Sequence, residues 1–141
     1  MLEMKAEARG SNGHFELEGA RVTILLVEDD SNSRCVITEM LKAFGHTVIE
    51  ACDGDDAIAK FLVHKDDIHQ VLMDIIMPRK NGLDAYLELK AIQPEVKIIL
   101  MSGYSRDYLS GKLDKEEDVH FISKPFAPKA LFEKIQFVLN A

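Results

Sequence analysis

Apolar residues follow two alternating patterns along this chain: short unbroken runs, and longer segments in which they return every three or four positions. The short runs lie at residues 22–27, 46–51, 70–73, 96–101 and 119–123. A continuous run of this length that contains β-branched residues is typical of a strand buried on both faces of a sheet. The intervening segments have the period of an amphipathic helix, so strands and helices are expected to alternate.

Capping residues indicate where the helices begin and end. Ser31 is the expected N-cap of the first helix, and Gly45 stands where a C-cap glycine belongs. Asp55 and Asp56 favour the first turn of the second helix through the helix dipole, and Pro128 fits the first turn of the last. The apolar stripes expected to face the core are Val36, Ile37, Met40, Leu41 and Phe44, then Ala57, Ile58, Phe61 and Leu62, then Leu83, Leu87 and Ala91, then Leu131, Ile135, Val138 and Leu139.

This alternation predicts an α/β fold: a doubly wound, five-stranded parallel sheet with helices on both faces. A third helix is expected to end before Pro94, and the polar, less regular residues 105–115 are expected to form a weak fourth helix. Residues 1–20 have no clear period, and we interpret them as a flexible N-terminal tail or linker outside the core. Residues 21–141 then form one domain.

Composition narrows the class of protein. The chain has 141 residues, 47% of them hydrophobic and 29% charged, as in ordinary globular domains. A net charge of −7 argues against broad, charge-driven binding to nucleic acid. No apolar run approaches the roughly 18 residues of a membrane span, and no signal-peptide core is present, so a cytoplasmic protein without membrane insertion is expected. Cys35 and Cys52 lack metal-ligand spacing and are interpreted as reduced, buried thiols.

Polar side chains stand where four of the predicted strands end. They are the acids after residue 27, Asp74, Ser102 with the following glycine, and Lys124 with the following proline. The carboxyl ends of parallel strands share one edge of a sheet, so these groups are expected to meet there. Acids at strand ends are often helix caps or solvated loop residues, and Asp30 is expected to be one. Each group alone is weak evidence; the four together predict a site.

The chemistry expected at that edge is phosphoryl transfer. Glu28, Asp29 and Asp74 would repel one another unless a cation joined them, and oxygen ligands of this kind suit Mg²⁺. Lys124 adds a positive charge and Ser102 a hydroxyl, which together suit the charge on a transferring phosphoryl group. An aspartate can itself accept that group as an acyl phosphate, so Asp74 can be both nucleophile and metal ligand.

From residue 22 to residue 139 the chain resembles the receiver domain of two-component response regulators, which has a flavodoxin-like fold. The motifs that carry the resemblance occur in the right order: Glu28-Asp29, Asp74-Ile75-Ile76-Met77-Pro78 with Asn81-Gly82, Met101-Ser102-Gly103, and Phe121-Ile122-Ser123-Lys124-Pro125-Phe126. The stretch from residue 101 to residue 105 also resembles receivers attached to hybrid sensor histidine kinases, which leaves open a receiver excised from one.

The resemblance implies a role for each matching residue in a phosphorelay. Asp74 is the phosphorylation site and takes the phosphoryl group from a sensor histidine kinase or a histidine phosphotransfer protein. Mg²⁺ is held by Glu28, Asp29, Asp74 and the backbone carbonyl of Ile76. Apart from catalysing its own phosphorylation and slow dephosphorylation, the domain is not expected to be an enzyme.

The resemblance also implies a switch. Ser102 and Lys124 contact the phosphoryl group, Ser102 moves with it, and Phe121 occupies the place of an aromatic residue that changes rotamer. The Lys124-Pro125 peptide is cis in the family. Ile76 and Tyr104, two positions after Asp74 and Ser102, stand where many relatives carry polar residues, so they are expected to control the phosphoryl lifetime. Phe121 lacks the hydroxyl of the commoner tyrosine.

Two other functions compete with this interpretation. A phosphatase of the haloacid-dehalogenase type also uses a strand-end aspartate but wants a second acid at the position of Ile76. A non-phosphorylated pseudo-receiver scaffold would be expected to lack some of the acids or the lysine. Because the chain ends at Ala141, directly after the last predicted helix, output is expected through contact with an unknown downstream protein rather than by direct nucleic-acid binding.

Overall fold

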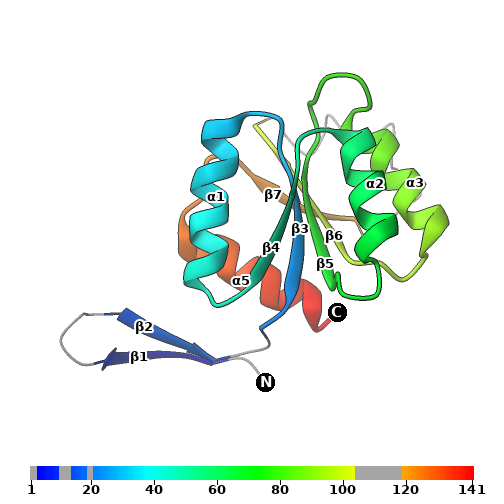
Figure 1. Cartoon of the computed structure of the whole chain (residues 1–141). Coiled ribbons are helices and arrows are strands. Elements are labelled where there is room, and N and C mark those ends of the chain that lie inside the picture. Colours follow the sequence, from blue (N-terminus) through cyan, green and yellow to red (C-terminus); the bar gives the residue numbers. More distant parts are fainter. Residues whose placement is uncertain (1–2, 10–13, 19–20, 104–118) are drawn as a thin grey trace.

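The computed structural model describes residues 3–9, 14–18, 21–103 and 119–141 (Figure 1). Its main sheet has five parallel strands in the order β4-β3-β5-β6-β7. The strands are β3 (Thr23–Val27), β4 (Thr47–Ala51), β5 (Gln70–Asp74), β6 (Ile98–Ser102) and β7 (His120–Ser123). The predicted α/β fold with a five-stranded parallel sheet is confirmed.

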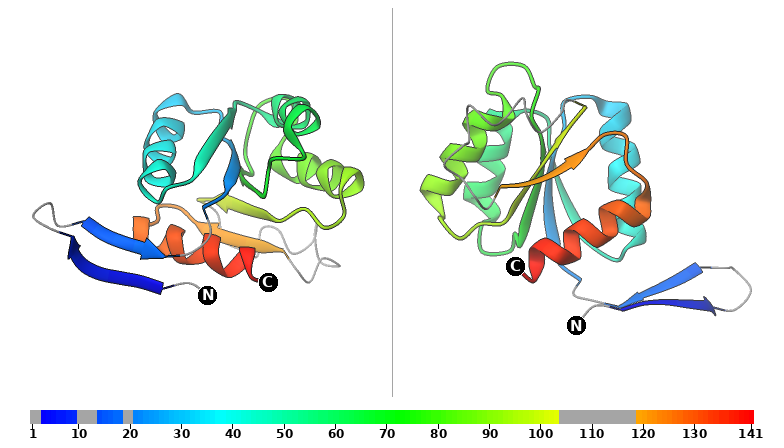
Figure 2. Two further views of the ribbon diagram at one scale, coloured as in Figure 1. Left: turned by 60° about the horizontal axis from the view of Figure 1, so that its bottom comes forward. Right: turned by 180° about the vertical axis from the view of Figure 1, so that it is seen from behind.

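Helices cover both faces of this sheet (Figures 1 and 2). They are α1 (Ser31–Ala43), α2 (Gly54–His64), α3 (Gly82–Ile92) and α5 (Pro128–Leu139). The side chains of α1 and α5 share one apolar core, and those of α2 and α3 share the other. The weak helix predicted over residues 105–115 lies outside the described residues. No helix in the described part of the chain is both long and apolar enough to span a bilayer.

Strand β3 shows why an unbroken apolar run suits this fold. Ile24 and Leu26 belong to the core beneath α1 and α5, whereas Leu25 and Val27 belong to the core beneath α2 and α3. Successive side chains of a strand point to opposite faces, so a strand covered on both sides must be apolar at every position. All four side chains are fully buried.

The apolar stripes of the helices are narrower than the sequence predicts. Val36, Leu62 and Leu87 were expected in the core but are 55%, 53% and 50% exposed. The prediction that Cys35 and Cys52 are buried is also wrong, because both are exposed. Helical period locates the centre of a buried stripe, whereas the neighbouring elements decide how far burial extends around the helix.

Asp30, which was expected to be a helix cap or a solvated loop residue, is the N-cap of α1, so the prediction of Ser31 as N-cap is wrong. Its backbone is extended, and its carboxylate accepts a hydrogen bond from the Ser33 amide at 2.8 Å. An acid at this position also interacts favourably with the helix dipole. The predicted C-cap glycine is present: Gly45 has φ +97°, a left-handed conformation that glycine adopts readily.

Residues 3–18 contain two strands where the sequence predicts a tail or linker. Strand β1 (Glu3–Arg9) pairs antiparallel with β2 (His14–Glu18) as a separate two-stranded sheet. Neither strand joins the five-stranded sheet (Figure 1). The boundary between this N-terminal stretch and the domain starting at residue 21 stays a prediction.

Candidate functional site

The predicted polar groups lie at the carboxyl ends of the strands, around the place where the order of the strands reverses. Strand β3 lies between β4 and β5, so the chain runs outward from it in both directions. Such a switch point is the usual location of a site in an open parallel sheet. Glu28 directly follows β3, Asp74 ends β5, Ser102 ends β6, and Lys124 directly follows β7.

Three carboxylates gather at this edge. One oxygen from each of Glu28, Asp29 and Asp74 lies within 4.8 Å of the other two. Glu28 and Asp74 are only 2% and 8% exposed, whereas Asp29 is exposed to solvent. Three carboxylate oxygens this close, with one side open to water, fit a hard divalent cation such as Mg²⁺ that keeps several water ligands.

Lys124 brings the counter-charge to the two buried acids. Its Nζ donates to Glu28 Oε1 at 2.7 Å and lies 3.3 Å from Asp74 Oδ1. Its backbone amide donates to the Ser102 carbonyl at 2.8 Å, and the Lys124-Pro125 peptide is cis, as the family resemblance implies. Burial alone would lower the pKa of Lys124, but the hydrogen bond to Glu28 and the charge of Asp74 outweigh it, so this pKa is raised.

The pKa of Asp74 is higher in the folded protein than that of an aspartic acid exposed to water. Burial and then the charge of Glu28 raise the pKa of Asp74 to about 6, although Lys124 opposes both effects. Without a cation, one lysine is shared between two buried carboxylates, so the charge of Asp74 is incompletely balanced. A bound divalent cation would supply the missing positive charge.

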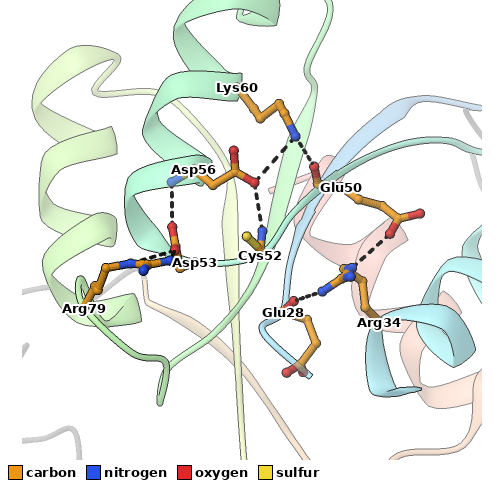
Figure 3. Close-up of polar contacts among 8 residues, drawn as sticks. All are labelled: Glu28, Arg34, Glu50, Cys52, Asp53, Asp56, Lys60 and Arg79. Carbon is orange, nitrogen blue, oxygen red and sulfur yellow. Dashed lines mark hydrogen bonds and ion pairs between the residues drawn. The ribbon is translucent and has the colours of Figure 1, made fainter. Parts of the chain in front are cut away.

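The loop that carries the first two acids is tied down by a residue that sequence reasoning missed. Arg34 Nη1 donates to the backbone carbonyl of Glu28 at 2.8 Å, and Arg34 Nε pairs with Glu50 at 3.0 Å (Figure 3). Glu28 Oε2 also accepts from the Asp30 amide at 3.1 Å. Arg34 lies seven residues after Val27, so no local motif connects it to the site.

The remaining predicted residues surround this centre. Ser102 is buried beside β5, because its neighbour Met101 pairs with Asp74. Phe121 is half-buried and packs against the core beneath α2 and α3. Ile76 is 48% exposed on the loop after β5. Tyr104, the other residue predicted to control the phosphoryl lifetime, lies outside the described residues.

An apolar groove adjoins the site. It has a volume of about 500 Å³ and is lined by Asn32, Ser33, Val36, Ile37, Met40, Lys124, Pro125 and Phe126. The lining comes from α1 and from the segment after β7. Lys124 therefore belongs both to the groove and to the carboxylate cluster.

Comparison with known proteins finds one family over most of the chain. The profile of the response regulator receiver domain matches residues 24–136. The chain is 34% identical to the chemotaxis protein CheY of Thermotoga maritima over 116 residues, which are 82% of this chain and 95% of that protein. It is 32% identical to the sensor kinase CckA of Brucella abortus over 125 residues, which are 89% of this chain but 13% of the kinase.

The fold agrees with this match. A response regulator receiver domain protein from Clostridium thermocellum superposes with a TM-score of 0.78 at 25% identity, covering 84% of this chain and 94% of that one. The receiver domain of the hybrid histidine kinase CckA superposes with a TM-score of 0.67 at 28% identity, covering 83% of this chain and 98% of that one.

Proposed function

The chain belongs to the response regulator receiver domain family of two-component signalling, and on that premise we propose that it is a phosphoacceptor module that takes a phosphoryl group onto Asp74. The observation that carries the proposal is the position of Asp74. It shares a cluster of three carboxylates with Glu28 and Asp29, and it lies 3.3 Å from the Lys124 ammonium. A nucleophilic carboxylate needs such positive charge to receive a dianionic phosphoryl group.

In the proposed reaction, an oxygen of ionised Asp74 attacks the phosphorus of a phosphorylated histidine. The new P–O bond forms an acyl phosphate as the P–N bond breaks, and the departing imidazole nitrogen keeps the electron pair and takes up a proton. Lys124 is close enough to Asp74 to donate a hydrogen bond to the transferred group. The reaction needs Asp74 unprotonated, so its raised pKa makes cation binding important.

Mg²⁺ would be held by Glu28, Asp29 and Asp74, with the backbone carbonyl of Ile76 as the ligand that the family resemblance adds. When bound, the ion neutralises charge on the phosphoryl oxygens. Lys124 and the ion would then divide the balancing of negative charge between them. Beyond its own phosphorylation and the slow hydrolysis of its acyl phosphate, no turnover is proposed for the chain.

We further propose that the histidine donor docks in the apolar groove between α1 and the segment after β7. The groove is continuous with the site because Lys124 lines both. A kinase or phosphotransfer protein seated against Val36 and Phe126 would place its histidine next to Asp74. The contact area would be apolar at its centre, as protein interfaces commonly are.

The alternative functions have less support. Ile76 has no side-chain oxygen to serve as the second acid of a haloacid-dehalogenase-type phosphatase. A pseudo-receiver scaffold would not need the complete set of acids and lysine that meets here. The pseudo-receiver scaffold would become the better account if the wild type gained no phosphoryl group.

The test is intact mass after incubation with acetyl phosphate and Mg²⁺. The wild type should gain one phosphoryl group, whereas Asp74→Asn should gain none. Asp29→Ala and wild type in excess chelator should also gain none. Asp66→Asn removes a carboxylate exposed beyond the end of α2 and should be phosphorylated like the wild type. Phosphorylation of Asp74→Asn, or of wild type in chelator, would overturn the proposal.

A further inference from the structure

The loop between β5 and α3 is held from outside by the N-terminus of α2. The Arg79 guanidinium, on the loop, donates to Asp53 Oδ2 through Nε at 3.1 Å and also through Nη2 (Figure 3). The Asp53 side chain is 4% exposed although the Arg79 side chain is 70% exposed. Asp53 Oδ1 meanwhile caps α2 by accepting from the Asp56 amide at 2.7 Å. Both oxygens of a buried carboxylate are therefore engaged, one by the helix and one by the loop.

A second contact fixes the same turn of the loop. The Gly54 amide donates to the Lys80 carbonyl at 3.2 Å. A Cβ at position 54 would lie 2.4 Å from that carbonyl oxygen, so only glycine lets the two backbones approach this closely. The helix N-terminus thus holds consecutive loop residues, Arg79 by its side chain and Lys80 by its backbone.

Arg79 has an unfavourable backbone conformation that the ion pair helps to maintain. Its φ is +61°, the only positive φ at a non-glycine residue in the described part of the chain. Residues other than glycine are disfavoured at positive φ, and they keep this backbone conformation only where their surroundings hold them in it. The Asp53 carboxylate is positioned to do so.

The base of the loop is closed as well. The Gly82 amide donates to the Ile75 carbonyl at 2.7 Å, and a Cβ at Gly82 would lie 2.3 Å from the Asp74 carbonyl oxygen. Ile76 lies between this closed base and the turn held by α2. The position of its carbonyl therefore depends on both ends of the loop.

We propose that Asp53 and Arg79 are positioning residues for the cation site, because their ion pair holds the loop that carries the Ile76 carbonyl, the ligand that the resemblance to receiver domains adds. This inference rests on the proposed function. Mg²⁺ requires near-octahedral geometry, so it tolerates a displaced ligand poorly. A backbone carbonyl can be positioned only through the loop that carries it, and partners outside the ligand set commonly control metal affinity in this way.

If the Asp53–Arg79 contact were only an ordinary surface ion pair, its removal would affect Mg²⁺ binding differently. Exposed pairs contribute little, and truncating one has small effects. Loss of the Arg79 charge would, by long-range electrostatics alone, make a nearby cation bind more tightly. Loss of the positioning contact should make it bind more weakly. The direction in which Mg²⁺ affinity changes in Arg79→Ala therefore distinguishes a positioning contact from a purely electrostatic effect.

The experiment is calorimetric titration of the whole chain with Mg²⁺ alone. Arg79→Ala should raise the dissociation constant about tenfold, and Arg79→Lys, which can still pair with Asp53, should restore most of the affinity. Asp53→Asn keeps a good N-cap and should weaken binding more than Asp66→Asn, which removes the same charge elsewhere. Lys65→Ala removes an exposed positive charge at the end of α2 and should not weaken binding.

Phosphorylation by acetyl phosphate gives a second readout. Arg79→Ala should need more Mg²⁺ for half-maximal rate yet approach the wild-type rate when the ion saturates, because the nucleophile and Lys124 are untouched. Unchanged or tighter Mg²⁺ binding by Arg79→Ala would overturn the inference alone, provided the wild type binds the ion and is phosphorylated. A wild type that binds no Mg²⁺ would overturn both this inference and the proposed cation site.

Discussion

Lys124 and Glu28, 96 positions apart in the sequence, are joined by a hydrogen bond of 2.7 Å. This contact occupies the ammonium that Asp74 also needs, and Asp74 Oδ1 lies at the longer distance of 3.3 Å. Glu28 is thus the better neutralised of the two buried acids. Burial and the charge of Glu28 raise the pKa of Asp74 to about 6, and Lys124 offsets only part of that rise.

Asp74→Asn should stabilise the metal-free protein near pH 7. The native state binds the Asp74 proton more tightly than the unfolded chain does, since the pKa rises from 3.8 to about 6 on folding. Ionising Asp74 above that pKa therefore costs stability, on the order of 1–3 kcal/mol, which an asparagine avoids. Below the unfolded pKa the carboxyl is neutral in both states, so the advantage should vanish there.

Urea unfolding in chelator at about pH 7 and about pH 3.5 measures this difference. The gain from Asp74→Asn should shrink as the pH falls between these values. Saturating Mg²⁺ should reverse the order at neutral pH, since it binds the wild-type carboxylate. An Asp74→Asn protein less stable than the wild type in chelator at neutral pH would contradict the interpretation.

Val36→Asp should slow phosphoryl transfer from a histidine donor without slowing the phosphorylation of Asp74 by a small phosphodonor. Val36 is 55% exposed and lines the groove beside Lys124. A charge buried at an apolar contact should slow transfer from a phosphorylated histidine phosphotransfer protein roughly tenfold or more. Phosphorylation by acetyl phosphate should keep its wild-type rate, because that small donor needs no docking surface.

The matched control is Val63→Asp, because Val63 is 75% exposed on α2, away from the groove lining. Both rates should stay unchanged in that variant. Rapid-quench measurement of transfer from the phosphorylated donor compares the three proteins. Equal rates of phosphoryl transfer to the wild type and Val36→Asp would show that the groove is not part of the docking surface.

His46 should make the fold sensitive to acid. It is 4% exposed, its Nδ1 accepts a hydrogen bond from the Val22 amide at 3.1 Å, and Nε2 is buried without a hydrogen-bond partner in the described structure. Burial, and to a smaller extent the charge of Arg21, lowers the pKa of His46 below its ordinary value of 6.5. The unfolded chain therefore binds the proton first, and stability should fall as the pH drops below 6.5.

His46→Asn tests this dependence, because the asparagine oxygen can replace Nδ1 as acceptor but does not titrate. The variant should be less stable than the wild type at neutral pH, where the smaller side chain leaves a cavity. The difference should narrow as the pH is lowered from about 7 to about 5. A difference in unfolding free energy that is constant over this range would show that His46 does not titrate with folding.

Phosphorylated Asp74 should be long-lived. Hydrolysis needs a water in line with the acyl phosphate, and Ile76, two positions after Asp74, has no group to orient it. The double change Ile76→Asn with Tyr104→Glu should speed decay by roughly tenfold or more, because positioned polar groups assist attacking water. Loss of the phosphoryl mass over time, in Mg²⁺ buffer without partner, measures the lifetime.

The control for the lifetime is Ile76→Leu, which keeps the apolar character and adds no hydrogen-bonding group. Its phosphorylated form should decay at the wild-type rate. Equal decay in the wild type and the double variant would show that these positions do not set the lifetime.

The five strands and the polar residues at their carboxyl ends could be predicted from the amino-acid sequence alone. Strands such as Thr23–Val27 are recognisable because burial on both faces demands an apolar residue at every position, which leaves an unbroken run. Asp74, Ser102 and Lys124 follow or end such runs, and parallel strands bring those ends to one edge. The role of Gly45 at the end of α1 could also be predicted, because a helix that ends in a left-handed residue favours glycine there.

Which side chains touch at that edge of the sheet, and the raised pKa of Asp74, depend on tertiary packing. Lys124 could have balanced either buried acid, and the choice depends on how the segment after β7 packs against the end of β3. The Asp53–Arg79 contact joins two loops whose order in the sequence contains no trace of the pairing. Such contacts depend on the relative placement of whole elements, which follows from side-chain packing between them and not from the period or local chemistry of either one.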